Sequence, residues 1–159
     1  MVDLATAIAF FGPPLAFLGG AVGSTLGIAA AASAGLAVVS EDPAYRSRVL
    51  ILSSLPMTQT FYGFIFMLVA LMRLHTYVSF GKLDPIKALA ILAISLAVCF
   101  AEMYSAITQG RVCRDAISLL IHTRGGIMGM GILLAAYEEL FGILALAFGI
   151  MAMMMVLSW

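Results

Sequence analysis

The last apolar run of the chain, residues 126–158, holds the residues with the clearest potential for chemistry. It contains no Lys or Arg, and its only two acids, Glu138 and Glu139, stand side by side in its interior. About 20 apolar residues are enough to cross a bilayer, so this run places two carboxyl groups deep in hydrocarbon. A charge at that depth is costly unless it is partnered, so the pair marks a candidate functional site.

The polar residues that could partner these carboxyls lie in two other apolar runs. We count residues from Arg46, His122 and Ile127, where the cytoplasmic ends of the three helices are expected. Gln59, Gln109 and Glu139 lie 12 or 13 residues from these starting points. At 1.5 Å per residue each is about 18–20 Å along its own helix. We therefore expect the three polar side chains to share one level in the membrane.

The chemistry available at that level suits a small hard cation, which prefers oxygen ligands. The oxygens come from the Thr58 hydroxyl, the Gln59 and Gln109 amides and the Glu139 carboxylate. One monovalent cation would neutralise the carboxylate. Because no cluster of His and Cys accompanies these residues, zinc is not indicated.

Two residues of the second run support this site. Pro56 lacks the N–H that would bond the carbonyl four residues earlier, so it should kink the helix and free local carbonyls. Tyr62 lies on the same helix side as Leu55, Thr58 and Gln59, at spacings of three and four residues. Its hydroxyl could donate a hydrogen bond to the carboxylate.

Each polar residue also has a simpler interpretation. A Thr such as Thr58 commonly bonds its own helix backbone, and a Gln such as Gln59 or Gln109 commonly joins two helices. Tyr62 alone could be a packing aromatic. The coincidence of depth favours the functional interpretation over these separate ones.

Two further acids leave alternatives open. Glu138 points about 100° away from Glu139 on an ideal helix, and it would be the ligand if the register were off by one. Glu102 precedes Gln109 by seven residues and lies about 10 Å further from the cytoplasm. It either lines an exit path or sits near the outer interface.

Composition predicts an all-α integral membrane protein. Of 159 residues 64% are hydrophobic and 10% are charged, whereas a soluble domain carries about 25% charge. Eight basic residues balance eight acidic ones, so net charge does not indicate nucleic acid as a partner. Four transmembrane helices are expected, at about residues 13–39, 45–77, 85–123 and 126–158.

The ends of these helices carry local signals. Pro13 and Pro14 suit a first helical turn, where the missing N–H is not needed. Asp84 and Pro85 suit an N-cap followed by a first-turn proline. Between the last two helices, the glycine break at 124–126 leaves room for little more than a tight turn.

Small residues recur every four positions in the first and third helices, which favours close helix approach in lipid. The first stripe is Gly19, Gly23, Gly27, Ala31 and Gly35, and the second is Ala93, Ala97, Ala101 and Ser105.

The two halves of the chain echo each other. At an offset of 80 residues Gln59 falls on Glu139 and Phe61 falls on Phe141. We interpret this as two tandem helical hairpins, residues 1–80 and 81–159, from a weak internal duplication. Five arginines flank the two hairpin turns and three basic residues flank the middle break. This bias predicts cytoplasmic hairpin turns and both termini outside.

These motifs resemble a known family, the proteolipid (K or c) subunit of bacterial V-type (V/A-type) rotary ATPases in its four-helix, duplicated form. The resemblance covers essentially the whole chain. The motifs that carry it are Leu55-Pro56-Met57-Thr58-Gln59 with Tyr62-Gly63-Phe64, then Gln109-Gly110-Arg111, then Glu139 ahead of Phe141-Gly142-Ile143.

The resemblance implies a ligand set. In the sodium-translocating members the ion is held by a backbone carbonyl and four side chains, and a tyrosine bonds the carboxylate. The matching positions are the Leu55 carbonyl, Thr58, Gln59, Gln109 and Glu139, with Tyr62 as the tyrosine. All six residue types are the same here, which favours Na⁺ over H⁺. The chain departs from the family pattern at Glu138, where an apolar residue is common, and at Met57, where a small one is common.

The resemblance also implies partners. Identical subunits would form a ring with the small-residue helices on its inner wall. The ring would turn against a stationary membrane subunit that supplies an arginine, and a central stalk would couple it to ATP-hydrolysing subunits. A bacterial plasma membrane is the expected location. The chain has no phosphate-cradling motif of its own, so we expect a non-catalytic subunit.

Three alternatives stay open at this point. The same rotor protein could carry H⁺ instead of Na⁺. A free-standing four-helix ion-coupled transporter would need no cytoplasmic partner. A purely structural membrane bundle would not need Glu139 for transport.

Overall fold

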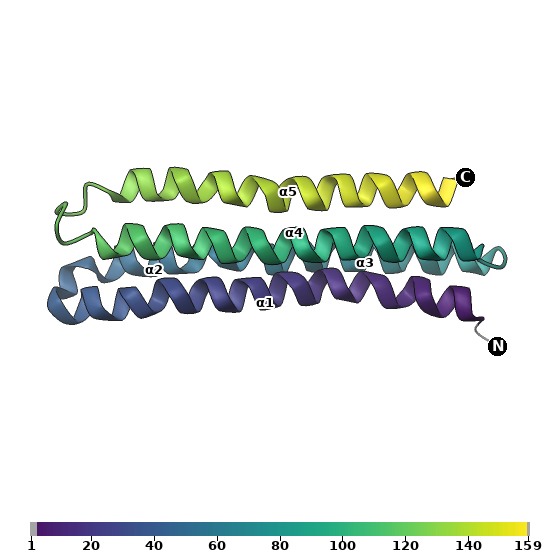
Figure 1. The fold of residues 1–159 in the computed structure, drawn as a ribbon, viewed down its shortest axis with the longest axis horizontal. Coiled ribbons are helices and arrows are strands. Elements are labelled where there is room, and N and C mark those ends of the chain that lie inside the picture. Colours follow the sequence, from purple (N-terminus) through teal and green to yellow (C-terminus); the bar gives the residue numbers. More distant parts are fainter. Residues whose placement is uncertain (1–2, 159) are drawn as a thin grey trace.

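Four long helical segments run side by side in the computed structural model, which describes residues 3–158 (Figure 1). Each is long and apolar enough to cross a membrane. This confirms the predicted all-α membrane fold. The elements are α1 (Leu4–Glu41), η1 (Pro43–Tyr45), α2 (Arg46–Ser54), η2 (Leu55–Met57), α3 (Thr58–Ser79), α4 (Pro85–Ser118) and α5 (Met128–Ser158).

Helix α1 begins well before the predicted start. Asp3 is its N-cap and accepts a hydrogen bond of 2.8 Å from the Thr6 backbone N–H. Pro13 and Pro14 therefore lie inside the helix, and the expectation that they form its first turn is wrong. Proline is tolerated inside membrane helices because neighbouring helices can satisfy the freed backbone groups.

The second segment is continuous but changes its winding near the middle. The single-turn 3₁₀ helix η2 contains Pro56 and separates α2 from α3. Proline removes one backbone donor and crowds the preceding turn, which is the expected cause of such a local change. The 3₁₀ turn lies at the position where the sequence predicts a kink at Pro56.

The ends of α4 differ in how well they follow the sequence signals. Asp84 caps the start of α4, as predicted, by accepting a hydrogen bond of 2.7 Å from the Ile86 backbone N–H. The other end, at Ser118, comes before the predicted end near residue 123, and α5 starts at Met128 rather than 126. Residues 119–127 form a series of turns instead of one tight turn.

The first stripe of small residues is where α1 lies against its neighbours. A Cβ added to Gly19 would overlap the backbone of Cys99, and one added to Gly23 would overlap the backbone of Met103. Gly27 lies directly against Gly110. The predicted close approach is therefore present, and it joins α1 to α4 along most of their length.

The second stripe does not form the matching surface. Ala93 and Ala97 are exposed, while the α4 residues that meet α1 include Cys99, Met103 and Ala106. A four-residue repeat drifts around a helix of 3.6 residues per turn, so it does not by itself specify which neighbour it faces.

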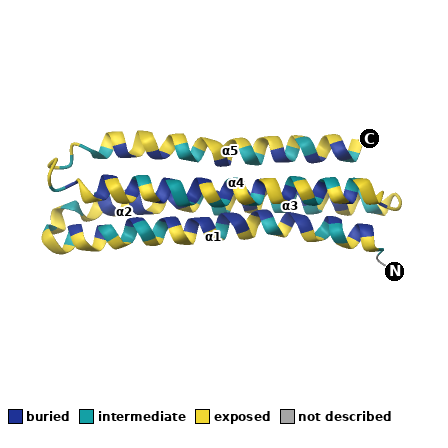
Figure 2. Ribbon diagram, viewed as in Figure 1, coloured by how far each residue is buried: buried dark blue, intermediate teal, exposed yellow. Residues whose placement is uncertain are grey.

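The packing leaves a polar layer between two apolar ones. One buried cluster, which includes Phe66, Ile91 and Met153, lies toward the end that holds both termini. A second, which includes Leu52 and Ile117, lies toward the hairpin turns. Burial runs along the inner faces of the helices while the outer faces stay exposed (Figure 2). Buried polar side chains lie between the two clusters.

Candidate ion-binding site

Hydrogen bonds join the two glutamines and the glutamate across three helices. The Gln59 amide Nε2 of α3 donates to Gln109 Oε1 of α4 over 3.0 Å. Gln109 Nε2 donates to Glu139 Oε2 of α5 over 3.4 Å, and to the Ala135 carbonyl over 3.0 Å. Both glutamine side chains are fully buried. The structure thus brings together the three residues that were expected at one level.

Next to Gln59, the break at η2 gathers further oxygens. The Thr58 hydroxyl donates to the Leu55 carbonyl over 3.1 Å and lies 3.2 Å from Gln59 Oε1. Thr58 therefore bonds its own backbone, as its simpler interpretation requires, and also contacts the buried amide. The Leu55, Thr58 and Gln59 oxygens form one compact group at the start of α3.

Tyr62 fixes the other side of the carboxylate. Its hydroxyl donates to Glu139 Oε1 over 2.7 Å, so the hydrogen bond expected between these residues is present. The Glu139 side chain is half-buried and both of its oxygens have a donor. Hydrogen bonds of this kind to a carboxylate are roughly twice as strong as neutral ones.

Glu138 turns to a different neighbour. Its Oε2 accepts a hydrogen bond of 2.7 Å from the Thr108 hydroxyl of α4. It has no hydrogen bond to either glutamine among the described residues. The carboxyl that contacts Gln109 and Tyr62 belongs to Glu139.

Comparison with known proteins finds one matching family model and two similar proteins. The family model of the ATP synthase C subunit matches residues 11–70. The "A-type ATP synthase subunit K" of Methanocaldococcus jannaschii is 34% identical over 133 residues, which are 84% of this chain and 57% of that protein. The "V-type sodium ATPase subunit K" of Enterococcus hirae is 29% identical over 123 residues, 77% of this chain and 75% of that protein.

Residues 11–70 match the ATP synthase C-subunit family, and both relatives are subunit K proteins. These similarities agree with the family resemblance found in the sequence, and the proteins of that family are non-catalytic membrane components. The chain spans little more than half the length of the Methanocaldococcus relative. Both alignments are longer than one hairpin of about 80 residues, so they extend beyond residues 11–70.

Two hydroxyl residues that were not expected at the site complete the polar layer. Ser105 accepts a hydrogen bond of 3.0 Å from Gln59 Nε2 and donates one of 2.7 Å to the Glu138 backbone carbonyl. Thr108 is the second, through its bond to the Glu138 carboxyl. The spacing of Ser105, four residues before Gln109 on the same helix face, is the signal that could have identified it.

Glu102 belongs to the same layer but lacks partners. It is fully buried on α4, and neither carboxyl oxygen has a hydrogen-bond partner among the described residues. The sequence left open an exit path or a position near the outer interface. The structure places Glu102 among α3, α4 and α5 rather than on an exposed helix face.

The donor set of this C-subunit homologue fits a small monovalent cation. Carbonyl, hydroxyl, amide and carboxylate oxygens are available, and they are the ligand types that hard cations prefer. Glu139 supplies one negative charge, so one such cation would make its part of the site neutral. Neutrality is what a site inside a bilayer requires.

Proposed function

We propose that this chain is the ion-carrying proteolipid of a V/A-type rotary ATPase, with Na⁺ as its cargo at Glu139. The observation that carries the proposal is the hydrogen-bonded connection from Gln59 through Gln109 to Glu139. The Leu55 carbonyl, Thr58, Gln59, Gln109 and Glu139 would supply the oxygen ligands, and Tyr62 would orient the carboxylate.

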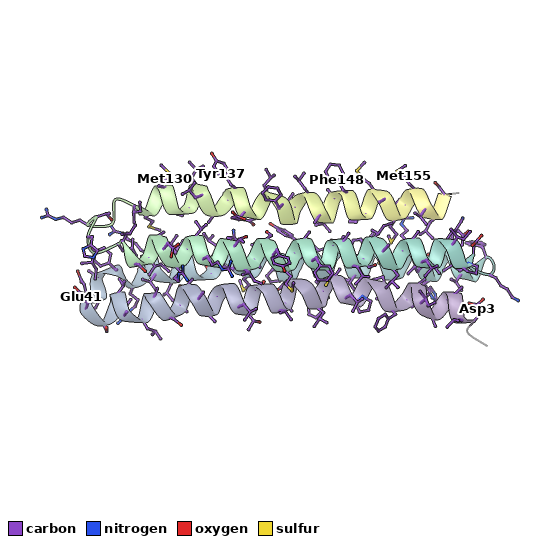
Figure 3. The ribbon with its side chains drawn as sticks, in the orientation of Figure 1. Asp3, Glu41, Met130, Tyr137, Phe148 and Met155 are labelled. Atoms are coloured by element: carbon purple, nitrogen blue, oxygen red, sulfur yellow. The ribbon has the colours of Figure 1, made fainter. Side chains whose placement is uncertain are left out.

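The assembly in this proposal is a ring of identical subunits. α1 and α4 pack against each other most extensively, which suits an inner wall, while α3 and α5 lie outside them. Exposed apolar side chains of α5 support contact of that helix with lipid. Met130, Tyr137, Phe148 and Met155 all point away from the other helices (Figure 3).

The two other partners are a stationary membrane subunit with an arginine and a central stalk. With Na⁺ bound, Glu139 forms a neutral site that can pass the lipid as the ring turns. Once emptied, its carboxylate needs a positive charge nearby, which the stationary arginine would supply. Moving one charge across 100 mV corresponds to about 2.3 kcal/mol, so several ions per ATP are energetically reasonable.

In the membrane, we place the two hairpin turns in the cytoplasm and both termini outside. The two turns lie at one end of the molecule and the termini at the other (Figure 1). Arginines gather at the turn end of the chain, which supports this orientation under the positive-inside rule. The same arrangement supports residues 1–80 and 81–159 as two duplicated hairpins.

The oxygen atoms beside Gln59 favour Na⁺ over H⁺ as cargo. A proton on Glu139 would need only the carboxylate and a neighbouring acceptor. The compact group of Leu55, Thr58 and Gln59 oxygens would then have no ionic role, whereas Na⁺ requires several oxygen ligands.

Carbodiimide labelling of the assembled protein tests this choice. At mildly alkaline pH we expect Na⁺ to slow labelling of Glu139, because a cation-bound carboxylate does not take up the proton that the reagent requires. No effect of Na⁺ would leave the proton as cargo. The mass of the assembly in detergent separates the ring from a free-standing transporter, since a dimer would exclude the rotor.

A further inference from the structure

Glu102 is an acid that the proposed site does not use. Its side chain is fully buried, and neither oxygen has a hydrogen-bond partner among residues 3–158. Buried polar groups nearly always have a partner, and a buried carboxylate without one costs many times the energy of a lost hydrogen bond. Something other than the protein groups in this structure must therefore compensate Glu102.

The space around this carboxyl is shaped by a glycine. A Cβ added to Gly142 of α5 would lie 2.8 Å from Glu102 Oε2 and 3.2 Å from the Tyr62 ring. Gly142 has no side chain, and the Glu102 carboxyl lies against it between α4 and α5. The carboxyl thus occupies a built recess, about one helical turn along α5 from Glu139.

Among the described residues, no ion pair involves Glu102. The nearest basic residue on its own helix, Arg111, is nine positions away, about 13 Å along the axis. α5 carries no basic residue, and Arg73, the basic residue of α3, is 11 positions beyond Tyr62. The other two acids in the layer already have donors, since Thr108 bonds Glu138 and Tyr62 bonds Glu139.

We propose that Glu102 holds a proton, so that each subunit carries a neutral carboxylic acid in its polar layer besides the ion at Glu139. Na⁺ needs several oxygen ligands, whereas the groups found beside the Glu102 carboxyl are Gly142, the Tyr62 ring and the Gln59 Cγ atom. The proposal goes beyond the proposed function and does not depend on which ion occupies Glu139.

The test uses the full-length protein in its assembled form, with Glu102→Gln and Glu139→Gln variants. Infrared difference spectra report protonated carboxyl groups, and radioactive sodium reports Na⁺ bound per chain. We expect Glu102→Gln to remove one protonated-carboxyl band and to leave the Na⁺ bound per chain unchanged. An unchanged set of bands overturns the proposal, and so does a loss of Na⁺ without the loss of a band.

The variants also separate this proposal from the one for Glu139. The Glu102 signal should be present in Glu139→Gln and absent in the double variant. A loss of Na⁺ binding on Glu139→Gln alone bears on the proposed function and leaves the Glu102 result unchanged.

A second substitution keeps the test valid if Glu102→Gln does not fold. Gly142→Ala retains the carboxyl but places a methyl group in its recess. We expect it to shift the frequency of the Glu102 band, because the added methyl group would lie 2.8 Å from Glu102 Oε2. The matched control is Gly129→Ala on the same helix, where an added Cβ meets nothing within 4 Å. A Glu102 signal that Gly142→Ala and Gly129→Ala leave equally unchanged would contradict the proposed recess.

Discussion

Tyr62 of α3 and Glu139 of α5 are joined by a hydrogen bond of 2.7 Å, although 77 residues separate them in the chain. This bond crosses from the first hairpin to the second. It holds one carboxylate oxygen of Glu139 toward the interior of the bundle, while the neighbouring Tyr137 points away from it.

We predict that Tyr62→Phe weakens cation binding while the fold is retained. The substitution removes one hydrogen bond to a charged group, which contributes about 1.5–3 kcal/mol. If most of this stabilisation is present only when the cation is bound, the Kd for the cation rises roughly tenfold or more. The Na⁺ concentration that half-protects Glu139 from carbodiimide labelling measures the change. Tyr137→Phe, on the exposed face, is the control and should not alter this concentration; equal effects of both variants would argue against the role of Tyr62.

Gln109→Ala should lower both stability and cation affinity. Gln109 is fully buried and bonds Gln59, Glu139 and the Ala135 carbonyl. Its loss leaves buried partners unsatisfied, at about 1–3 kcal/mol for each group. Thermal unfolding in detergent measures the first effect and Na⁺ protection the second. An unchanged midpoint together with unchanged protection would mean that Gln109 is not a structural part of the site.

Substitutions of the two adjacent acids, Glu138 and Glu139, should have very different effects on ion transport. Glu139→Gln is expected to abolish Na⁺-dependent transport by the reconstituted complex, because the charge that binds the cation is gone. Glu138→Gln is expected to keep most of it, since Glu138 bonds Thr108 and has no hydrogen bond to the glutamines. Transport that survives in Glu139→Gln but fails in Glu138→Gln would move the site by one residue.

Gly110→Ala should destabilise the subunit. Its Cβ would overlap the backbone of Gly27, where α4 and α1 lie in direct contact, and the backbone cannot give way as a flexible side chain can. Overpacking of this kind costs about 1–3 kcal/mol. Thermal unfolding compared with Gly129→Ala, where the space is open, gives the measurement. A Gly110→Ala protein as stable as that control would show that the helices can separate without penalty.

The features that follow from local chemistry could be predicted from the sequence. Asp84 before Pro85 is a strong cap signal, and it does cap α4. The meeting of Gln59, Gln109 and Glu139 follows from the constant rise of a helix, which makes depth a matter of counting residues. The 3₁₀ turn at Pro56 follows from the missing N–H of proline.

The features that depend on helix rotation and neighbouring contacts could not be predicted in this way. In the sequence Ser105 is one member of a stripe of small residues. Its hydrogen bond with Gln59 depends on how α4 is rotated relative to α3, which the sequence pattern does not specify. The stripe that contains Ala93 and Ala97 predicts close helix approach, but both residues are exposed, because a four-residue repeat does not define which neighbour it faces. Pro13 and Pro14 predict a helix start, but proline is also tolerated inside a membrane helix, so these residues do not define where α1 begins.

The most direct test of the whole account is a structure of the assembled protein determined with Na⁺ present. We predict density for one ion among the Leu55 carbonyl, Thr58, Gln59, Gln109 and Glu139. Density at Glu138 instead, or no density within reach of the Glu139 carboxylate, would contradict it.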